Sequence, residues 1–284
     1  MSELSFRFGT VGSPISTPKK PGGSVGAVLR LAELDLHAFE IGWVRSVRVS
    51  EKTCEEIKST AAESGVAVSV HAPYFINLNG DDEEWPKSRQ RLMDAAHYGN
   101  LAGASDIIFH PGSYFEHPPD EVLKVALPRL QDCLDELRAD DNPVNLRPET
   151  MGKSAMLGSL EDTLKMSRQI KGVAPCLDFA HLHARPGDGS MNTYDEWSQV
   201  LEDYAAALGE EALKELHIHL SGIEYGEKGE KEHLPVQDSD LDCKAIFRAL
   251  NDFKASGRIV CESPEMENDA LYLKDLWCIV SGEG

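Results

Sequence analysis

The chain has 284 residues, 41% of them hydrophobic, a size that fits two average domains or one barrel-sized domain of about 250 residues. No stretch approaches the roughly 18 apolar residues that a membrane helix needs, and residues 1–10 lack the basic and apolar regions of a signal peptide. The six cysteines are widely spaced and form no C-x-x-C pair. This argues against a zinc ribbon or a disulfide framework and is typical of a reducing cytoplasm, where we expect the protein.

The formal net charge is −20 at pH 7. Acidic residues are concentrated in segments 81–84, 132–141 and 224–242, which we interpret mainly as a solvated acidic surface. A nucleic-acid-binding protein usually carries a basic patch, which this composition does not suggest. A host with high internal salt would select such a surface and would also screen its repulsion of DNA.

Short apolar runs alternate with amphipathic stretches along the whole chain. The apolar runs, each predicted as a strand, are Leu4–Gly9, Ala38–Trp43, Val66–Val70, Asp106–Phe109, Val144–Leu146, Val173–Leu177, Leu216–Leu220 and Arg258–Cys261. The predicted helices are Gly26–Leu34, Thr53–Ser64, Lys87–Ala102, Asp120–Ala139, Ser159–Ile170, Tyr194–Ala207, Leu241–Phe253 and Asn268–Val280.

Unbroken strand–helix alternation predicts a parallel (β/α)8 barrel, an α/β fold in which residues 1–284 form a single domain. A doubly wound sheet is the alternative, but no glycine-rich phosphate loop follows the first apolar run. Ser159 with Asp162 resembles a helix capping box. The segment 221–241 is predicted as a long charged loop, which in a compact domain is usually functional or disordered.

A polar side chain suited to metal binding lies within, ends or follows nearly every predicted strand. In chain order these residues are Glu40, His71, His110, Glu149, Asp178, His219 and Glu262. Strand ends of a barrel meet at one mouth, where barrel enzymes carry out their chemistry. Histidine and carboxylate groups are ligands that zinc and manganese prefer. One such histidine would be an ordinary core residue, whereas six consecutive strands ending on a ligand indicate a metal site.

Two more histidines join this set, His181 in the predicted loop just after Asp178 and His233 in the long charged loop. The total exceeds the roughly four ligands of a single ion, so the residues predict two or three ions. Ions about 3.5–4 Å apart are a common solution for phosphoester hydrolysis.

Several short motifs occur in order along the chain. They are His71-Ala-Pro-Tyr-Phe-Ile-Asn-Leu78, Phe109-His-Pro-Gly-Ser113, Pro148-Glu-Thr150 with Gly152, Leu177-Asp-Phe-Ala-His-Leu-His183, His219-Leu220 and Cys261-Glu-Ser-Pro264. Through these motifs the chain resembles the endonuclease IV family of apurinic/apyrimidinic endonucleases. The resemblance covers roughly residues 65–264, in order, while the first 60 residues match poorly. The family fold is also a (β/α)8 barrel of the xylose isomerase-like superfamily.

The resemblance implies a trinuclear zinc centre, with manganese as an alternative ion. Its ligands, by this resemblance, are His71, His110 and Glu149 for the first ion, Glu149, Asp178, His219 and Glu262 for the second, and His181 and His233 for the third. Glu149 and Glu262 are the expected catalytic carboxylates.

The sequence departs from the family at the third ion. The family places an Asp two residues before the last histidine, where this chain has Lys231, so Glu230 or Glu232 is the expected substitute. The Asn-Asp that follows the family's His-Leu is here Ser221-Gly222.

The resemblance also points to DNA contacts at Tyr74 and Phe75, since the family uses this loop to probe the base stack, with packing of Phe75 under the loop as the alternative. Arg185 is a candidate phosphate contact, and Glu40 is a candidate support for a ligand rather than a ligand itself.

Together these features predict a metal-dependent hydrolase, acting as a monomer without a membrane partner, that cleaves double-stranded DNA 5′ to abasic sites in base excision repair. One alternative is a sugar isomerase or epimerase, which needs only Glu149, Asp178, His219 and Glu262 around one ion. The other is a barrel that binds damaged DNA or metal without turnover.

Overall fold

The structure is a computed structural model that describes residues 4–284. Within that range, eight parallel strands form one sheet: β1 (Phe6–Val11), β2 (Ala38–Gly42), β3 (Ala67–His71), β4 (Asp106–Phe109), β5 (Asn145–Pro148), β6 (Cys176–Asp178), β7 (Leu216–Leu220) and β10 (Gly257–Cys261). The helices are α1 (Gly23–Glu33), α2 (Glu51–Ser64), α3 (Glu84–Leu101), α4 (Pro119–Ala139), α5 (Leu160–Gln169), α6 (Phe179–Ala184), α7 (Tyr194–Leu208), α8 (Cys243–Asp252) and α9 (Glu267–Ser281).

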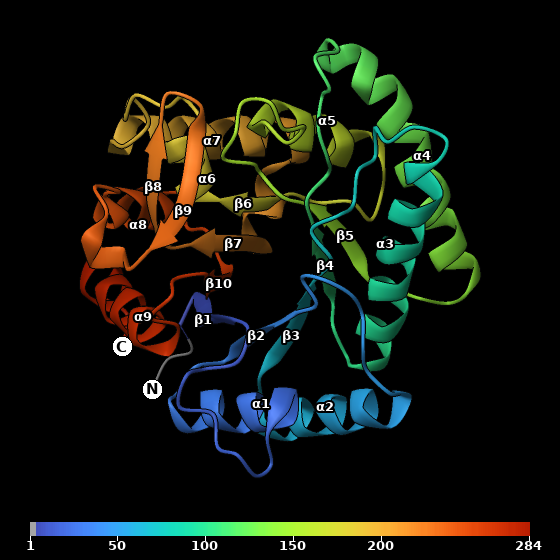
Figure 1. The fold of residues 1–284 in the computed structure, drawn as a ribbon. Coiled ribbons are helices and arrows are strands. Elements are labelled where there is room, and N and C mark those ends of the chain that lie inside the picture. Colours follow the sequence, from blue (N-terminus) through green and yellow to red (C-terminus); the bar gives the residue numbers. More distant parts are fainter. Residues whose placement is uncertain (1–3) are drawn as a thin grey trace.

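The sheet closes into a barrel. The strand order is β5-β4-β3-β2-β1-β10-β7-β6, and parallel bridges from Leu146 to Val173 and from Glu149 to Cys176 join its two ends. Figure 1 views this ring along its axis, with the helices outside it and the two ends of the chain close together. The predicted (β/α)8 barrel is confirmed, and the doubly wound alternative is wrong because its open sheet would leave two unpaired edges.

The large apolar core lies between the strands and the surrounding helices. On β1, for example, Phe6 packs edge-on against Trp277 of α9 with ring centroids 5.0 Å apart, and Phe8 against Phe247 of α8 at 6.4 Å. Side chains alternate along a strand, so Arg7, which lies between these phenylalanines, points to the opposite face of β1, toward the barrel axis.

The barrel interior is polar rather than apolar. Near the amino ends of the strands, buried Asp106 of β4 forms ion pairs with Arg147 of β5 and Arg258 of β10. The side chains of Glu40 and His217 are buried in the barrel as well. Buried charges are costly unless they are paired, so each charged side chain in this interior depends on its partners to remain buried.

Local signals explain where the helices begin and end. Ser159 and Asp162 form the predicted capping box at the start of α5, and Ser50 caps α2 by accepting from the Thr53 amide. Gly65 ends α2 with a φ of 67°, in the left-handed region that glycine adopts most readily.

Two predicted loops are wrong in detail because they contain regular structure. Segment 221–241 forms an antiparallel hairpin, β8 (Gly222–Gly226) and β9 (Gly229–Leu234), followed by a 3-10 turn at Val236–Asp238. Residues after Asp178 form the short helix α6 instead of a loop, and another 3-10 turn, Glu210–Lys214, precedes β7. Among the described residues, no helix combines the length and apolar character that crossing a membrane requires.

Candidate metal centre

The predicted ligands meet at the carboxyl ends of the barrel strands. His71 and Asp178 are the last residues of β3 and β6, and His219 lies one residue before the end of β7. His110, Glu149 and Glu262 directly follow β4, β5 and β10. The remaining two, His181 and His233, are carried by α6 and β9. Parallel strands thus bring residues from the whole chain to one mouth.

The first group consists of His71, His110 and Glu149, which each offer a ligand atom within 4.8 Å of the others. The Nε2 atoms of His71 and His110 lie 3.2 and 3.3 Å from the same oxygen, Oε2 of Glu149. Two imidazole nitrogens and one carboxylate oxygen around a small space are a donor set that suits zinc.

The second group consists of Glu149, Asp178, His219 and Glu262, again within 4.8 Å of one another. The Nδ1 atom of His219 lies 3.5 Å from Glu149 Oε1 and 3.5 Å from Glu262 Oε2. Glu149 belongs to both groups and directs one carboxylate oxygen toward each, which is the arrangement of a bridging carboxylate.

The third group is built around His181 and His233, and Asp178 offers an oxygen within 4.8 Å of both. Glu230 adds a further carboxylate, with Oε2 located 3.5 Å from His181 Nε2. Lys231 instead forms an ion pair with Glu224 at 2.8 Å, and Glu232 is exposed. Of the two substitutes that the sequence suggests, Glu230 is the one beside the histidines.

A β-bulge explains how Glu230 reaches this position. In the hairpin, Glu224 pairs with Glu232 and Tyr225 pairs with Glu230. Lys231 is therefore an extra residue that pairs with no residue of β8. Side chains of a regular strand alternate between faces, and the extra residue shifts that alternation by one. Glu230 and His233, three residues apart, therefore share a face.

Each of four ligand histidines has its second nitrogen held by another group. His71 Nδ1 lies 2.9 Å from the carbonyl oxygen of Ala72, and His181 Nδ1 lies 3.0 Å from that of Thr150. For His233, the contact is 2.6 Å from Nδ1 to the Ser221 hydroxyl. For His219, Nε2 lies 3.0 Å from Glu40 Oε1, which is an ion-pair distance without hydrogen-bond geometry. Such contacts fix ring orientation and tautomer in metal sites.

Several buried atoms that face the cluster have no hydrogen-bond partner within residues 4–284. They are Glu149 Oε1, Asp178 Oδ2, His181 Nε2 and His219 Nδ1. Buried polar groups without partners are costly, and divalent cations would satisfy all four. The donor set and its unpartnered atoms therefore fit metal ions.

The electrostatics of the metal-free site point the same way. Burial by itself would lower the pKa values of His71 and His181, but contacts with Glu149 and Asp178 raise them to about 9 and about 10. Burial, together with the nearby charges of Glu149 and Glu262, raises the pKa of Asp178 to about 7. Without cations, the crowded carboxylates are balanced by protons, which divalent ions would displace.

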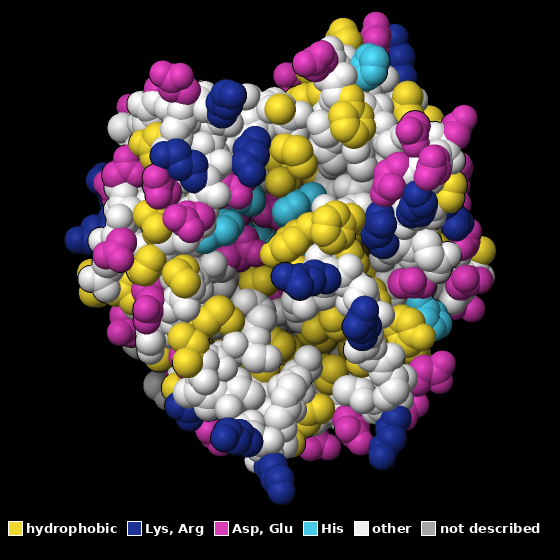
Figure 2. Space-filling view, viewed as in Figure 1, with side chains coloured by type: hydrophobic (Ala, Val, Ile, Leu, Met, Phe, Trp, Pro, Cys, Tyr) yellow, Lys and Arg dark blue, Asp and Glu magenta, His cyan; other side chains and the backbone are white. Residues whose placement is uncertain are grey.

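The mouth opens into a cavity of about 630 Å³ whose lining includes His110, His181, His233, Glu262 and Tyr74. Figure 2 shows histidine and acidic side chains at the floor of this hollow, with hydrophobic, lysine and arginine side chains around its rim. The acidic surface is therefore interrupted by basic groups near the site.

The predicted DNA contacts have different surroundings. The ring of Tyr74 stacks on His110 with centroids 5.0 Å apart. The ring of Phe75 does not pack under its loop, since Phe75 is 61% exposed with the Arg91 guanidinium 5.9 Å from its centroid. The guanidinium of Arg185 donates to the carbonyls of Met151, Lys153 and Met156, so Arg185 anchors the loop after β5.

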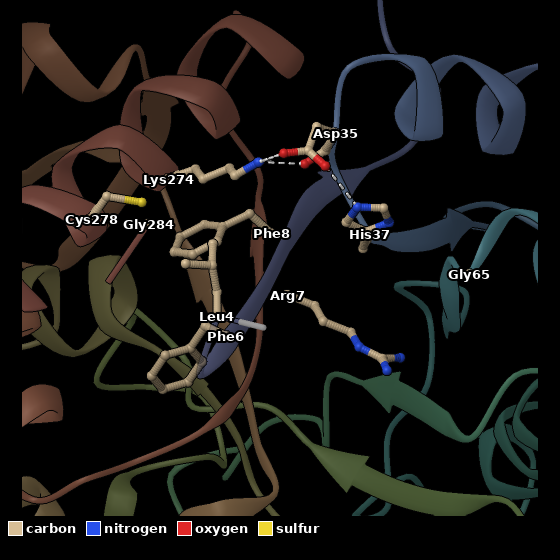
Figure 3. A pocket seen from close by; sticks show the side chains of 10 residues that line it. All are labelled: Leu4, Phe6, Arg7, Phe8, Asp35, His37, Gly65, Lys274, Cys278 and Gly284. Carbon is tan, nitrogen blue, oxygen red and sulfur yellow. Dashed lines mark hydrogen bonds and ion pairs between the residues drawn. The ribbon is translucent and has the colours of Figure 1, made fainter. Parts of the chain in front are cut away.

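A second cavity, of about 440 Å³, lies at the opposite end of the barrel, near the start of β1. Figure 3 shows Lys274 and His37 both pointing toward Asp35, which forms an ion pair with Lys274 and lies 3.0 Å from His37 Nε2. Lys274 neutralises the charge of Asp35, and the predicted ligands all lie elsewhere.

Sequence reasoning missed two contributors to the site, His217 and Ser221. His217 stands two residues before His219, a spacing that places both side chains on the same face of β7, and this signal was available. The role of Ser221 depends on the path of the hairpin and had no comparable local signal.

Several candidate metal-binding groups of histidine and carboxylate side chains lie at the mouth of this closed (β/α)8 barrel, an arrangement typical of metal-dependent barrel proteins. The chain belongs to the xylose isomerase-like TIM barrel family, whose model matches residues 28–278. It is 38% identical over 272 residues to an uncharacterized protein of Methanocaldococcus jannaschii, covering 95% of this chain and 96% of that one. It is 28% identical over 270 residues to a probable endonuclease 4 of Malacoplasma penetrans, covering 89% and 90%.

Solved structures show the same fold. Endonuclease IV from Thermus thermophilus superposes with a TM-score of 0.71 at 21% identity, covering 97% of this chain and all of that one. A D-tagatose 3-epimerase-like protein also gives a TM-score of 0.71, at 18% identity, covering 96% and 98%. At such identities the likeness concerns the fold alone, so the site itself must distinguish a nuclease from an epimerase.

Proposed function

We propose that this protein is a zinc-dependent endonuclease IV-like hydrolase that cleaves DNA on the 5′ side of abasic sites. The observation that carries the proposal is the surplus of histidines: His71, His110, His181 and His233 surround a quartet that could hold one ion by itself. The resemblance to probable endonuclease 4 sequences supports the same activity.

In this proposal, the first group holds one ion, the second group holds another, and His181, His233 and Glu230 hold a third. Bound ions would supply Lewis acidity, which lowers the pKa of the attacking water and offsets charge on the leaving oxygen. Water adds to phosphorus, the bond to the 3′ oxygen breaks, and that oxygen leaves as a hydroxyl. The phosphate remains on the abasic sugar.

The chain's own residues have three tasks in this scheme. Glu149 keeps the first two groups at a fixed separation, and Glu262 borders both the second group and the open mouth. Exposed Phe75 is available to stack in the space that the missing base leaves. An abasic nucleotide has lost its pairing and stacking, so it costs least to move into the mouth.

One assay tests the proposal. Zinc-loaded protein is incubated with a duplex that carries one abasic site, and the products are sized and their ends identified. We expect a single nick giving a 3′-hydroxyl and a 5′-deoxyribose phosphate, with no cleavage of the same duplex without the lesion. Absence of cleavage at full zinc loading would refute the nuclease and favour a barrel that binds DNA or metal without turnover.

A sugar epimerase or isomerase is the second candidate, because Glu149, Asp178, His219 and Glu262 alone can bind one divalent ion. Its discriminator is metal content together with substrate. One manganese or magnesium ion per chain, with turnover of a free sugar and none of DNA, would favour it over the nuclease.

A further inference from the structure

Glu40 is a carboxylate enclosed in the middle of the barrel. It lies in β2 beside Ser69 of β3, and its exposed fraction is 0%. An unpaired carboxylate buried at this position would strongly destabilise the fold. Contacts with neighbouring side chains must therefore offset the cost of burying Glu40.

These partners come from two other strands. Oε2 of Glu40 accepts a hydrogen bond from the Ser69 hydroxyl at 2.9 Å and lies 2.8 Å from His217 Nε2. Oε1 lies 3.0 Å from Nε2 of His219. The carboxylate thus bridges the two histidines that face inward from β7.

His219 connects Glu40 to the metal centre. Its Nδ1 is the atom that faces Glu149 and Glu262, each at 3.5 Å, while its Nε2 faces Glu40. The ring therefore has one nitrogen for the second group of ligands and one for a buried carboxylate. A carboxylate that holds the second nitrogen of a ligand histidine orients the ring and increases its basicity.

Cys176, His217 and His219 also lie close enough to resemble a ligand group of their own. We disfavour a separate ion there because the Glu40 carboxylate lies 2.8 Å from Nε2 of His217 and 3.0 Å from Nε2 of His219. The contacts assign His217 and Ser69 to Glu40, not to a separate ion.

We infer that Glu40 is a positioning residue, which directs His219 Nδ1 into the second ligand group and is itself held by His217 and Ser69. The inference rests on the metal centre of the proposed function but not on the DNA substrate. Removing the charge of Glu40 should weaken the binding of one metal ion without changing any atom that would contact that ion.

The test compares Glu40→Gln with Glu267→Gln. Glu267 is a second buried carboxylate, which accepts from the backbone amides of Ile15 and Ser16 and belongs to none of the ligand groups. Zinc affinity is measured by competition with a chromophoric chelator, and ligand geometry by the visible absorption of cobalt-substituted protein. Far-ultraviolet circular dichroism verifies folding.

We expect Glu40→Gln to lower the affinity for one zinc ion by about 10–100-fold, the usual effect of losing a group that orients a ligand. The variant should also alter the visible spectrum of the cobalt-substituted protein. Glu267→Gln should change neither. If Glu40→Gln does not fold, Ser69→Ala provides the second arm, with a smaller loss at the same ion. Wild-type affinity and spectrum in the folded variant would overturn the positioning role.

The outcomes also separate this inference from the nuclease. A wild-type chain that binds no zinc overturns both the metal centre and the role of Glu40. A chain that binds zinc and loses an ion in Glu40→Gln, yet cleaves no abasic DNA, supports the positioning role while refuting the nuclease.

Discussion

Glu149 is shared by two of the candidate ligand groups. One of its oxygens faces His71 and His110, and the other faces His181 and His219. Burial would raise the pKa of Glu149, but its contacts with the imidazoles of His110 and His219 outweigh burial and hold that pKa well below its ordinary value, so this carboxylate is ionised at neutral pH.

Glu149→Gln should therefore remove charge and one ligand from two ions at once. We expect kcat on an abasic duplex to fall by more than about 100-fold, beyond the range that loss of a supporting contact produces. DNA affinity, measured by fluorescence anisotropy on an uncleavable abasic analogue, should change much less. Wild-type cleavage by the variant would show that Glu149 lies outside the reacting centre.

At the scale of elements, the hairpin of β8 and β9 determines the third group. Its bulge at Lys231 places Glu230 beside His181, whereas Glu232 is exposed. Glu230→Gln and Glu232→Gln form a matched pair of identical chemistry on the same strand. We expect elemental analysis to find one ion fewer in the first variant and the wild-type number in the second.

Deleting Lys231 tests the same geometry by removing the bulge while leaving Glu230 in the chain. A regular hairpin without the extra residue would place Glu230 two positions before His233, on the same face of the strand. The deletion variant should therefore retain the third ion. If both the deletion and Glu230→Gln retain every ion, the third group does not depend on Glu230.

The barrel, and the convergence of the candidate ligands at its mouth, could be predicted from the sequence because both depend on local patterns. A strand end is found from the few residues around it, as at His71 or Glu149. The hairpin was not predicted because Gly222–Leu234 is charged and lacks the apolar alternation of a strand. The contact between Glu40 and His217 joins positions 177 residues apart, and only barrel closure brings them together.

At the scale of the whole molecule, proton binding and zinc binding compete. In the metal-free protein, the pKa of His71 is raised to about 9 and that of Asp178 to about 7. A raised folded-state pKa contributes stability that is present at low pH and is lost as pH rises through that value. The metal-free protein should therefore lose stability between about pH 6 and pH 9.

Zinc should reverse this dependence, because its ligands bind when deprotonated. We expect the difference in Tm between zinc-loaded and chelator-treated protein to increase by at least about 5 °C from pH 6 to pH 9, given roughly 2–4 °C per kcal/mol in large domains. Scanning calorimetry of both forms across this range measures it. A difference that is constant with pH would show that zinc does not displace these protons.

The net charge of −20 leads to a prediction about salt. Even three divalent ions would leave the molecule strongly negative, so DNA must approach a local mouth with basic side chains at its rim (Figure 2). Ordinary DNA-binding proteins lose affinity steeply as salt rises, because binding releases counterions. Here salt also screens the acidic surface over about 8–10 Å near physiological strength, and it reaches ions inside the mouth less.

These two effects have opposite signs, and the repulsion should dominate at low salt. We expect kcat/KM on a short abasic duplex to rise with the first additions of potassium chloride and to fall only at high concentration, at fixed zinc. An abasic dinucleotide analogue with a single phosphodiester serves as the control, because its low charge should make its cleavage depend little on salt. A steep fall from the lowest salt onward would mean that basic contacts outweigh the acidic surface, and that this surface is no adaptation to high salt.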